Sequence, residues 1–336
     1  MFAVARGPRF YWWRPCVEKA VSLKPMKDFK FFRVDSLVDN SITDFDLFIS
    51  LEEHFILYSG DGYRWSRAEL TELLQAGHES FYIRAKDVTR ARMYETVVRL
   101  PQIEKELPPP ERIQSIEQVG AKFIQCLYDG ELTPACVERA REIADAMVNC
   151  VGEDRSCVKH LGVLADHDYY TYFHSLRVAA YAVSISLSLG LTGVEQLRQI
   201  ALGGIFHDIG KKDVPLTVLN KSGALTETEW KLMKSHPVLG FGHIEESVLA
   251  HVPREIVLHH HEKRNGAGYP HGLDGGSLLP EVQIATLADI FDALTSSRSY
   301  QTKRSRYEAL DFIKHRLLKE EVWPEAFKAL VMCLAS

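Results

Sequence analysis

The residues best suited to metal chemistry are concentrated in the second half of the chain. Of the 14 histidines, only His54 and His78 precede His160. Neutral imidazole and carboxylate ligands together suit Mn, Fe or Zn, and the absence of neighbouring cysteines argues against a structural zinc site. The candidate ligands are His174, His207, Asp208, His236, His260, His261 and Asp289.

The spacing around Asp208 predicts a helix that carries this carboxylate inward. Thr192, followed three positions later by Glu195, is typical of a capping box at a helix start. One helical face then holds Leu197, Ala201, Gly204, Ile205 and Asp208. Gly210 is expected to end this helix. A carboxylate on the inward face is costly unless it is paired or bound to a metal, so the His207-Asp208 pair is a stronger candidate than any single histidine.

A second capping-box pattern precedes His236. Thr226 and Glu229 have the required types and spacing, and they predict the start of another helix. Pro237 disfavours helical geometry in the residue before it, which predicts that His236 lies at the end of that helix.

Two further helices are predicted to carry the remaining ligands. One covers Val252–Glu262 and ends in three consecutive histidines. A glycine-rich loop follows, with Gly266 and Gly268 at positions typical of tight turns. Pro280 then starts a helix on which Asp289 and Asp292 lie one turn apart on one face.

The length of 336 residues suits about two domains, and a proline cluster indicates where they divide. Pro101, Pro108, Pro109 and Pro110 are typical of an extended linker. We predict a tail at 1–26, a small α+β domain at 27–100, a proline-rich linker at 101–115 and a mainly α-helical domain at 116–336.

The domain before the linker has strand and helix patterns but no set of residues that could do chemistry. Strands are predicted at Phe45–Leu51, His54–Ser59 and Phe81–Arg84. Helices are predicted at Ala68–Ala76 and from Asp87 to about Leu100. A regulatory role is the remaining expectation for this domain.

Charge and composition exclude several classes of protein. The net charge of −5 provides no basic field for a nucleic-acid duplex. The 6 cysteines contain no C-x-x-C pair, which is typical of reduced thiols in the cytoplasm. The longest weakly polar stretch, Val178–Leu191, is too short to span a bilayer. The N-terminus lacks the apolar centre of a signal peptide. We therefore expect a cytoplasmic protein without a membrane span or a duplex DNA or RNA partner.

Six stretches of the chain together carry a family resemblance. They are YTYFHS (170–175), HDIGKKDVP (207–215), LNKSGALTETEW (219–230), HPVLG (236–240), HHEKRNGAGYPHGL (260–273) and ADIFDALTSSRSY (288–300). In this order and spacing, they resemble the HD-GYP family of the HD phosphohydrolase superfamily over roughly residues 150–320. The resemblance does not extend to residues 1–100. It implies an all-helical HD-type phosphohydrolase domain after the small α+β domain.

The resemblance implies a site for two divalent metal ions, with Fe or Mn expected. His174, His207, Asp208 and Asp289 would bind one metal, and Asp208, His236, His260 and His261 the other, with Asp208 bridging. A hydroxide between the metals would attack the phosphodiester in line. Two cations favour this attack because they lower the pKa of bound water and stabilise both the attacking and the leaving oxygens.

Further residues are implied to contact the substrate. Lys211 would hold a phosphate oxygen or the bridging hydroxide as a fixed positive charge. Tyr269 in the Gly-Tyr-Pro loop would approach the substrate phosphate, and Arg298 a phosphate or a guanine. Asp168 and Asp292 are additional candidates for contacts around the site.

Some positions depart from the family pattern. The family often has Asp where this chain has Asn265, and Arg where it has Lys263; neither position is a ligand. His259 is interpreted as structural, because Glu262 fixes the register of the His-His-Glu motif. Some members have a glutamate four residues before the first histidine ligand, where it helps to hold a third metal. This chain has Tyr170 there, so we expect two metals.

The sequence therefore predicts a metal-dependent phosphodiesterase that hydrolyses a cyclic dinucleotide, with linear pGpG as the main product from cyclic di-GMP and GMP slow or absent. One alternative is a preference for cyclic GMP-AMP. Another is a catalytically weak sensor of the dinucleotide that acts through a protein partner. A third is an HD phosphohydrolase acting on a mononucleotide, against which the Gly-Tyr-Pro loop argues. A regulatory protein partner of the N-terminal domain and a homodimer are both compatible with the sequence.

Overall fold

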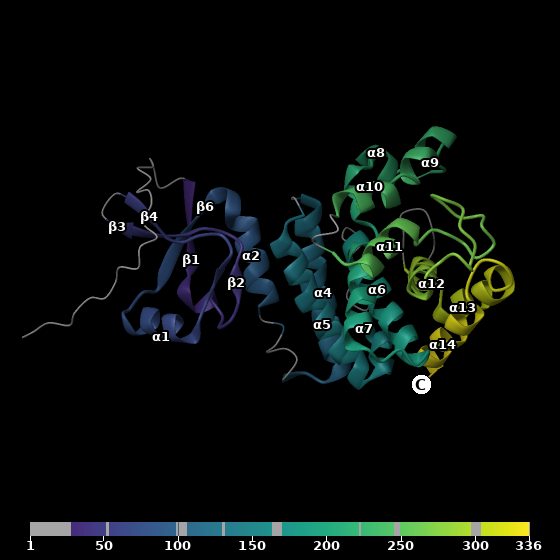
Figure 1. Cartoon of the computed structure of the whole chain (residues 1–336), viewed down its shortest axis with the longest axis horizontal. Coiled ribbons are helices and arrows are strands. Elements are labelled where there is room, and N and C mark those ends of the chain that lie inside the picture. The colour runs from purple at the N-terminus through teal and green to yellow at the C-terminus, as the bar shows by residue number, and fades with distance from the viewer. Residues whose placement is uncertain are drawn as a thin grey trace, which may run out of the picture. The chain divides into compact units, whose positions relative to one another are not determined.

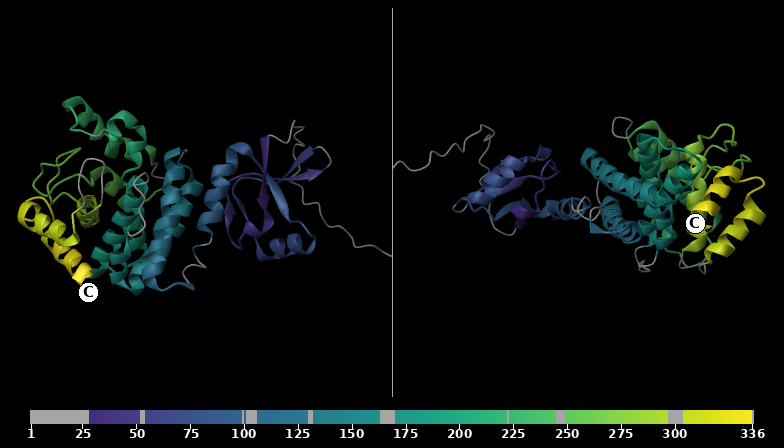
Figure 2. Two further views of the ribbon diagram at one scale, coloured as in Figure 1. Left: turned by 180° about the vertical axis from the view of Figure 1, so that it is seen from behind. Right: turned by 90° about the horizontal axis from the view of Figure 1, so that it is seen from below.

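The computed structural model describes residues 28–51, 54–98, 100, 106–129, 132–162, 170–221, 223–244, 249–296 and 304–335. The chain forms two compact units, Met1–Ala91 and Arg92–Ser336 (Figure 1). The named strands all lie in the first unit, and the second is helical (Figure 2). A small α+β unit followed by an all-helical one is the fold class that the sequence predicts.

The first unit is built on a four-stranded antiparallel sheet of order β1-β6-β3-β4. Its strands are β1 (Phe29–Arg33), β3 (Leu47–Leu51), β4 (His54–Ser59) and β6 (Ser80–Arg84). A two-stranded ribbon pairs β2 (Ile42–Thr43) with β5 (Tyr63–Arg64). The helix α1 (Arg67–Gln75) begins at a capping box formed by Ser66 and Glu69. Buried aromatic rings, among them Phe45, Trp65 and Phe81, fill the core.

The sequence predicts most of these elements. The three predicted strands correspond to β3, β4 and β6, and the predicted helix at 68–76 corresponds to α1. The predicted helix from Asp87 is α2 (Val88–Val97), which begins one residue later and ends three residues earlier. Strand β1 was not predicted, because the residues Phe31 and Phe32 interrupt strict alternation of apolar and polar side chains.

The second unit contains the following elements: α4 (Pro109–Asp129), α5 (Pro134–Glu153), α6 (Tyr170–Ser188), α7 (Val194–Phe206), α8 (Leu216–Leu219), α9 (Glu227–Met233), α10 (His236–His243), α11 (His251–His259), α12 (Pro280–Thr295), α13 (Arg306–Phe312) and α14 (Pro324–Ala335). Short 3-10 segments, η4 (Arg155–His160) and η6 (Ile209–Asp213), and a π-helical segment, η7 (Ile313–Leu317), connect some of them.

Helix α6 forms the centre of this unit. It packs against α4, α5, α7, α12 and α14, and its residues from Val178 to Val183 are buried. Gly204 allows α7 to approach it, because a Cβ at this position would lie only 2.6 Å from the Cα of Ala179. This close crossing brings the C-terminal end of α7 beside the N-terminal half of α6, where His174 lies.

Several sequence expectations differ from the structure, among them the end of the helix expected at Val252–Glu262, which is α11 and ends at His259. The expected linker at 101–115 is helical from Pro109 onward, since prolines are well tolerated in the first turn of a helix. The N-cap of α7 is Gly193, which has no side chain, and not Thr192. Helix α7 ends at Phe206 rather than at Gly210, which lies within η6. Among the residues that the structure describes, no helix is both long and apolar enough to cross a bilayer.

Candidate metal centre

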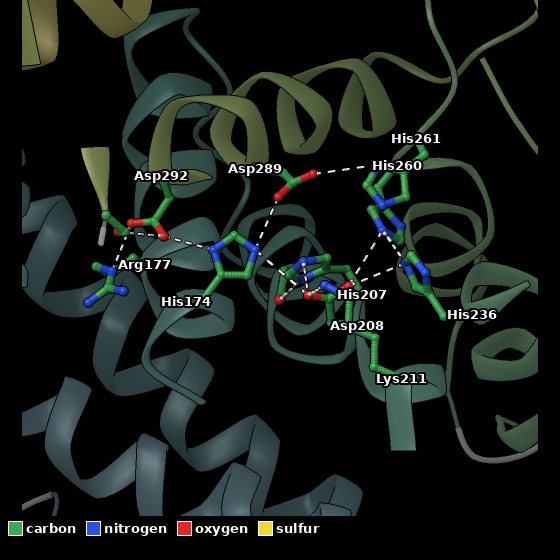
Figure 3. A network of polar contacts seen from close by, with 12 residues as sticks. His174, Arg177, His207, Asp208, Lys211, His236, His260, His261, Asp289 and Asp292 are labelled. Atoms are coloured by element: carbon green, nitrogen blue, oxygen red, sulfur yellow. Dashed lines mark hydrogen bonds and ion pairs between the residues drawn. The ribbon is translucent and has the colours of Figure 1, made fainter. Parts of the chain in front are cut away.

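Seven histidine and aspartate side chains converge in the second unit. In the described part of the chain, two groups have ligand atoms within 4.8 Å of one another: Asp208, His236, His260 and His261 form one, and His174, His207 and Asp289 the other. They come from α6, α10, α12 and the segments that follow α7 and α11 (Figure 3). These are the seven residues singled out in the sequence.

The carboxylate of Asp208 lies between the two groups. Its Oδ1 atom is 3.3 Å from Nε2 of His236 and 3.9 Å from Nε2 of His260. Its Oδ2 atom is 3.2 Å from Nε2 of His207 and 3.7 Å from Nε2 of His174. Each oxygen thus faces histidines of a different group, which is the arrangement required of a bridging ligand.

The histidines are oriented so that one ring nitrogen faces the centre. Nδ1 of His207 lies 2.8 Å from the carbonyl oxygen of Gly204, and Nδ1 of His236 lies 2.8 Å from that of Met233. His260 directs Nδ1 to carbonyl oxygens of the preceding helical turn. Donation from Nδ1 leaves the Nε2 lone pair to face inward, and such partners commonly orient metal-bound histidines.

Two buried atoms at the centre lack a hydrogen-bond partner. They are Nε2 of His207 and Oδ1 of Asp208, as judged within the part of the chain that the structure describes. An unsatisfied buried polar atom is costly, and a bound cation would satisfy both the lone pair and the carboxylate charge. The residues present therefore fit divalent cations.

Burial and neighbouring charges set the protonation of the ligand candidates. Burial lowers the pKa of His236 to about 4 and that of His261 to about 3, and it also holds the pKa of His260 well below its usual value. For Asp208, burial alone would raise the pKa, but His207 and Lys211 outweigh burial and hold the pKa well below its usual range. Burial alone would lower the pKa of His207, but Asp208 stabilises the charged form of His207 and its pKa is raised. The carboxylate is thus ionised, and three histidines are neutral, as metal ligands must be.

Gly210 and Pro237 explain how the chain places Asp208 beside His236. A Cβ at Gly210 would lie 2.0 Å from the carbonyl oxygen of His236 and 2.4 Å from the backbone nitrogen of Gly240. Gly210 is therefore needed for the close approach of η6 to α10, not to end α7. His236 is the first residue of α10 rather than the last of α9, and Pro237 occupies the first turn of α10. The capping box of Thr226 and Glu229 at the start of α9 is confirmed.

Asp292 contacts Nδ1 of His174, the ring nitrogen opposite the one that faces Asp208 and Asp289. Its Oδ2 is 2.7 Å from Nδ1 of His174, and its Oδ1 accepts a hydrogen bond of 2.7 Å from Nε of Arg177. Arg177 also donates to Glu117 of α4, which accepts the backbone N–H of Gly162. Arg177 and Glu117 were not among the predicted site residues, although Arg177 follows His174 by three positions, as Asp292 follows Asp289.

The Gly-Tyr-Pro loop is fixed by a buried carboxylate. Glu262 accepts the backbone N–H groups of His271, Gly272 and Leu273 at 2.7, 3.0 and 3.1 Å. A Cβ at Gly268 would lie 2.4 Å from the Cα of Glu262, so glycine allows the loop to fold back on the helix end. The Tyr269 ring consequently stacks on His261, with centroids 4.8 Å apart.

The remaining sequence candidates fall in different places. Lys211 lies at the centre, with Nζ 2.6 Å from Oδ2 of Asp208. Asp168 and Arg298 lie outside the described residues. Lys263 pairs with Glu321 at 2.8 Å.

Asn265 and His259 also lie apart from the two ligand groups. Asn265 accepts the backbone N–H of Ala267, a local loop contact. The ring of His259 lies between Glu255 and His271, at 3.1 and 3.0 Å.

Comparison with known proteins identifies the family. A model of the HD domain family matches residues 143–319, more than half of the chain, so the chain belongs to the HD domain family. Its fold is similar to that of Bd1817, an HDG"Y"P protein from Bdellovibrio bacteriovorus, with a TM-score of 0.63, 18% identity, and coverage of 92% of this chain and 100% of that one.

Curated relatives support the resemblance to HD-GYP proteins. The cyclic di-GMP phosphodiesterase PA4108 of Pseudomonas aeruginosa is 28% identical over 73% of this chain and 63% of its own length. The cyclic di-GMP phosphodiesterase response regulator RpfG of Xanthomonas campestris is 38% identical over 41% of this chain and 36% of its own length. The 3'3'-cGAMP-specific phosphodiesterase 1 of Vibrio cholerae is 32% identical over 48% of this chain and 37% of its own length. The chain thus spans less than two thirds of the length of each of these relatives. The predicted resemblance to the HD-GYP family is confirmed.

Proposed function

We propose that this chain is a metal-dependent phosphodiesterase that hydrolyses a cyclic dinucleotide, with cyclic di-GMP cut to linear pGpG. The observation that carries the proposal is the position of Asp208, whose two oxygens face histidines of two adjoining ligand groups. The names of the curated relatives support the substrate class.

The proposed cofactors are two divalent cations, Fe or Mn. His174, His207, Asp208 and Asp289 would hold one, and Asp208, His236, His260 and His261 the other. When bound, two such cations lower the pKa of water and stabilise the charge on the attacking and leaving oxygens of a phosphodiester. A set of imidazoles and carboxylates without thiolates suits these metals.

Several side chains would act directly on the substrate. Lys211, whose ammonium lies beside Asp208 and is only 19% exposed, would hold a phosphate oxygen or the attacking oxygen. Tyr269, whose ring stacks on His261, would approach the phosphate. Arg298 and Asp168 remain proposed contacts on the basis of the sequence resemblance alone.

The test is metal analysis of protein purified without oxygen, combined with turnover assays on cyclic di-GMP and on 3'3'-cGAMP. We expect two equivalents of Fe or Mn and linear pGpG from cyclic di-GMP. Loss of activity on chelation and its return on addition of Mn should accompany this result. Metal-loaded protein that hydrolyses neither dinucleotide would refute the proposal.

The same experiments test two alternative functions. Preference for cyclic GMP-AMP is favoured by the name of the Vibrio cholerae relative, and the ratio of kcat/KM values for the two substrates decides it. A sensor that acts through a protein partner would bind the dinucleotide without turnover. For the first unit we propose a regulatory role, since no group of metal ligands comparable to the centre occurs among its described residues.

A further inference from the structure

A lysine just beyond α9 lies between two aromatic rings at the edge of the candidate metal centre. The Nζ atom of Lys234 is 5.6 Å from the centroid of the Trp230 ring and 5.2 Å from that of the Tyr269 ring. Tyr269 in turn stacks on His261. Trp230, Lys234 and Tyr269 therefore form a continuous rim, the Trp-Lys-Tyr rim, which ends on a ligand candidate.

The charge of Lys234 is held by aromatic faces rather than by an acid. Lys211 pairs with Asp208, and Lys221 pairs with Glu229, each at hydrogen-bond distance. For Lys234, the contacts within the described residues are with the two rings, and no carboxylate among those residues is its ion-pair partner. Aromatic faces attract an ammonium without neutralising it, so Lys234 can still attract an anion.

The Trp230 side chain is 47% exposed and continues the rim outward from the centre. Nucleobases stack on exposed aromatic rings with little dependence on base identity. The rim therefore combines the two kinds of group that bind a nucleotide, a cation for phosphate and a π face for a base.

Helix α9 holds the rim in a fixed relation to the centre. Its first turn is closed by the capping box of Thr226 and Glu229. Its last turn provides the carbonyl oxygen of Met233, which lies 2.8 Å from Nδ1 of His236. The same short helix thus orients a ligand candidate and presents Trp230 and Lys234.

We propose that Lys234 binds the substrate phosphate that is not being cut and that Trp230 stacks on a substrate base. The inference rests on the proposed function, because a cyclic dinucleotide has two phosphodiesters and the metal centre engages one at a time. The second phosphate needs a cation away from the metals, where Lys234 lies. A simple diester with one phosphate and no base makes no use of either residue.

The experiment compares Lys234→Gln and Trp230→Leu with the metal-loaded wild-type protein. The dissociation constant is measured for a phosphorothioate analogue of cyclic di-GMP that is hydrolysed slowly, and KM and kcat are measured for cyclic di-GMP. Each variant should weaken binding and raise KM by about tenfold, as expected for the loss of one charged contact or one stacked base. The kcat should stay within about twofold, because the contact is the same in the ground and transition states.

Matched variants separate recognition from general effects. Lys231→Gln removes the same charge from α9, and Leu232→Ala removes another exposed apolar side chain; both should bind as the wild type does. Lys234→Arg and Trp230→Phe keep the charge and the ring, and should restore most of the affinity. Hydrolysis of methyl p-nitrophenyl phosphate, and metal content, should be unchanged in all variants.

The outcomes distinguish a failure of the proposed role of the rim from a failure of the proposed phosphodiesterase activity. Unchanged affinity in Lys234→Gln and Trp230→Leu, or an equal loss in Lys231→Gln, would overturn the rim even if the wild type hydrolyses the dinucleotide. Loss of metal in the variants would also overturn it, since α9 would then serve only to orient His236. If the analogue binds with the expected dependence on Lys234 but the wild type hydrolyses no dinucleotide, the rim stands and the phosphodiesterase activity is refuted.

Discussion

Asp208 carries a negative charge at a position that is 1% exposed. An unpaired carboxylate there would be strongly destabilising, and the surrounding histidines and Lys211 compensate for it only in part, because Oδ1 has no hydrogen-bond partner within the described residues. The sequence indicates this carboxylate through its inward helical face. The structure adds that each oxygen faces a different group of histidines.

We predict that Asp208→Ala abolishes metal binding and turnover together, because both groups lose their shared ligand. Metal analysis and a cyclic di-GMP assay on the same preparation test this. Asp213→Ala is the matched control, since Asp213 lies five positions further on and pairs with the half-exposed His243. An Asp208→Ala protein that keeps both metals and normal activity would refute the bridging role.

Lys211→Ala should keep both metals but lose most of the rate. Removing one group that stabilises charge in the transition state costs on the order of a hundredfold in kcat. Steady-state kinetics of the metal-loaded variant measure this, with Lys212→Ala as the neighbouring control. An unchanged kcat would show that Lys211 only balances the charge of Asp208.

Asp292→Asn should weaken metal binding, because Asp292 orients His174 and fixes which of its ring nitrogens carries the proton. Loss of such a partner typically costs about 10- to 100-fold in metal affinity or activity. Competition with a metal-sensitive dye gives the affinity, and thermal unfolding with chelator present shows whether the fold is intact. Substrate KM is the deciding comparison: a rise in KM with normal metal affinity would support the predicted substrate contact of Asp292 instead.

The sequence could predict the ligands but not their supports. The seven ligand candidates follow from residue type, motif order and the family resemblance. The partners of Nδ1 in His207, His236 and His260 are backbone carbonyls, which no residue type reveals. Helical spacing placed Asp292 on the same face as Asp289. It could not show that Arg177 of another helix donates a hydrogen bond to the second carboxylate oxygen of Asp292.

At the scale of elements, the approach of η6 to α10 decides whether the two ligand groups meet. The sequence predicts one helix that runs to Gly210, because periodicity continues through Asp208. The structure ends α7 at Phe206 and continues into the 3-10 segment η6, in which Gly210 packs on the backbone of α10. Helix termini of this kind are set by tertiary packing, which a local pattern does not contain.

Gly210→Ala should therefore destabilise the protein and disturb the metal centre. The added Cβ would lie 2.0 Å from the carbonyl oxygen of His236, so η6 and α10 must separate. Overpacking of this kind costs about 1–3 kcal/mol in the free energy of unfolding. Denaturant unfolding and metal content measure the two effects. Gly242→Ala in α10 is the control, since its Cβ meets nothing within 4 Å and its stability should not fall.

At the scale of the whole molecule, the chain divides into two compact units, Met1–Ala91 and Arg92–Ser336. The predicted division follows the prolines near position 101. The compact second unit begins at Arg92, and Met93, Val97 and Leu100 belong to its hydrophobic core together with residues of α4 and α5. Prolines indicate where a helix is interrupted, but not which core the residues before them join.

A fragment of residues 92–336 should fold and keep the metal centre without the first unit. A shorter fragment of residues 110–336 lacks the three core residues above and should be less stable, because each buried apolar side chain of this size contributes about 1.5–3 kcal/mol. Thermal unfolding and metal analysis of both fragments test this. Equal stability of the two would place the boundary at the prolines after all, and a metal-free longer fragment would show that the units are interdependent.

The last prediction concerns the number of metals and the product. The described residues contain two ligand groups that share the bridging position of Asp208. Tyr170, the first residue of α6, lies one turn before His174, where a carboxylate would be needed to hold a third cation. A phenol with a pKa near 10 is a poor ligand by comparison. We therefore expect two metals at full occupancy.

Two cations suffice for one in-line cut, which opens the ring of cyclic di-GMP. A second cut requires the linear product to bind again with a new terminal phosphate, whose additional negative charge has no third cation to hold it. Linear pGpG should accumulate, and GMP should appear slowly or not at all. Anomalous scattering from crystals of the metal-loaded protein counts the metals, and a chromatographic time course follows the products. Tyr170→Glu is the informative variant, because it should add a third metal and speed the formation of GMP. Three metals in the wild type, or GMP as its early main product, would show instead that other groups near the centre hold the terminal phosphate.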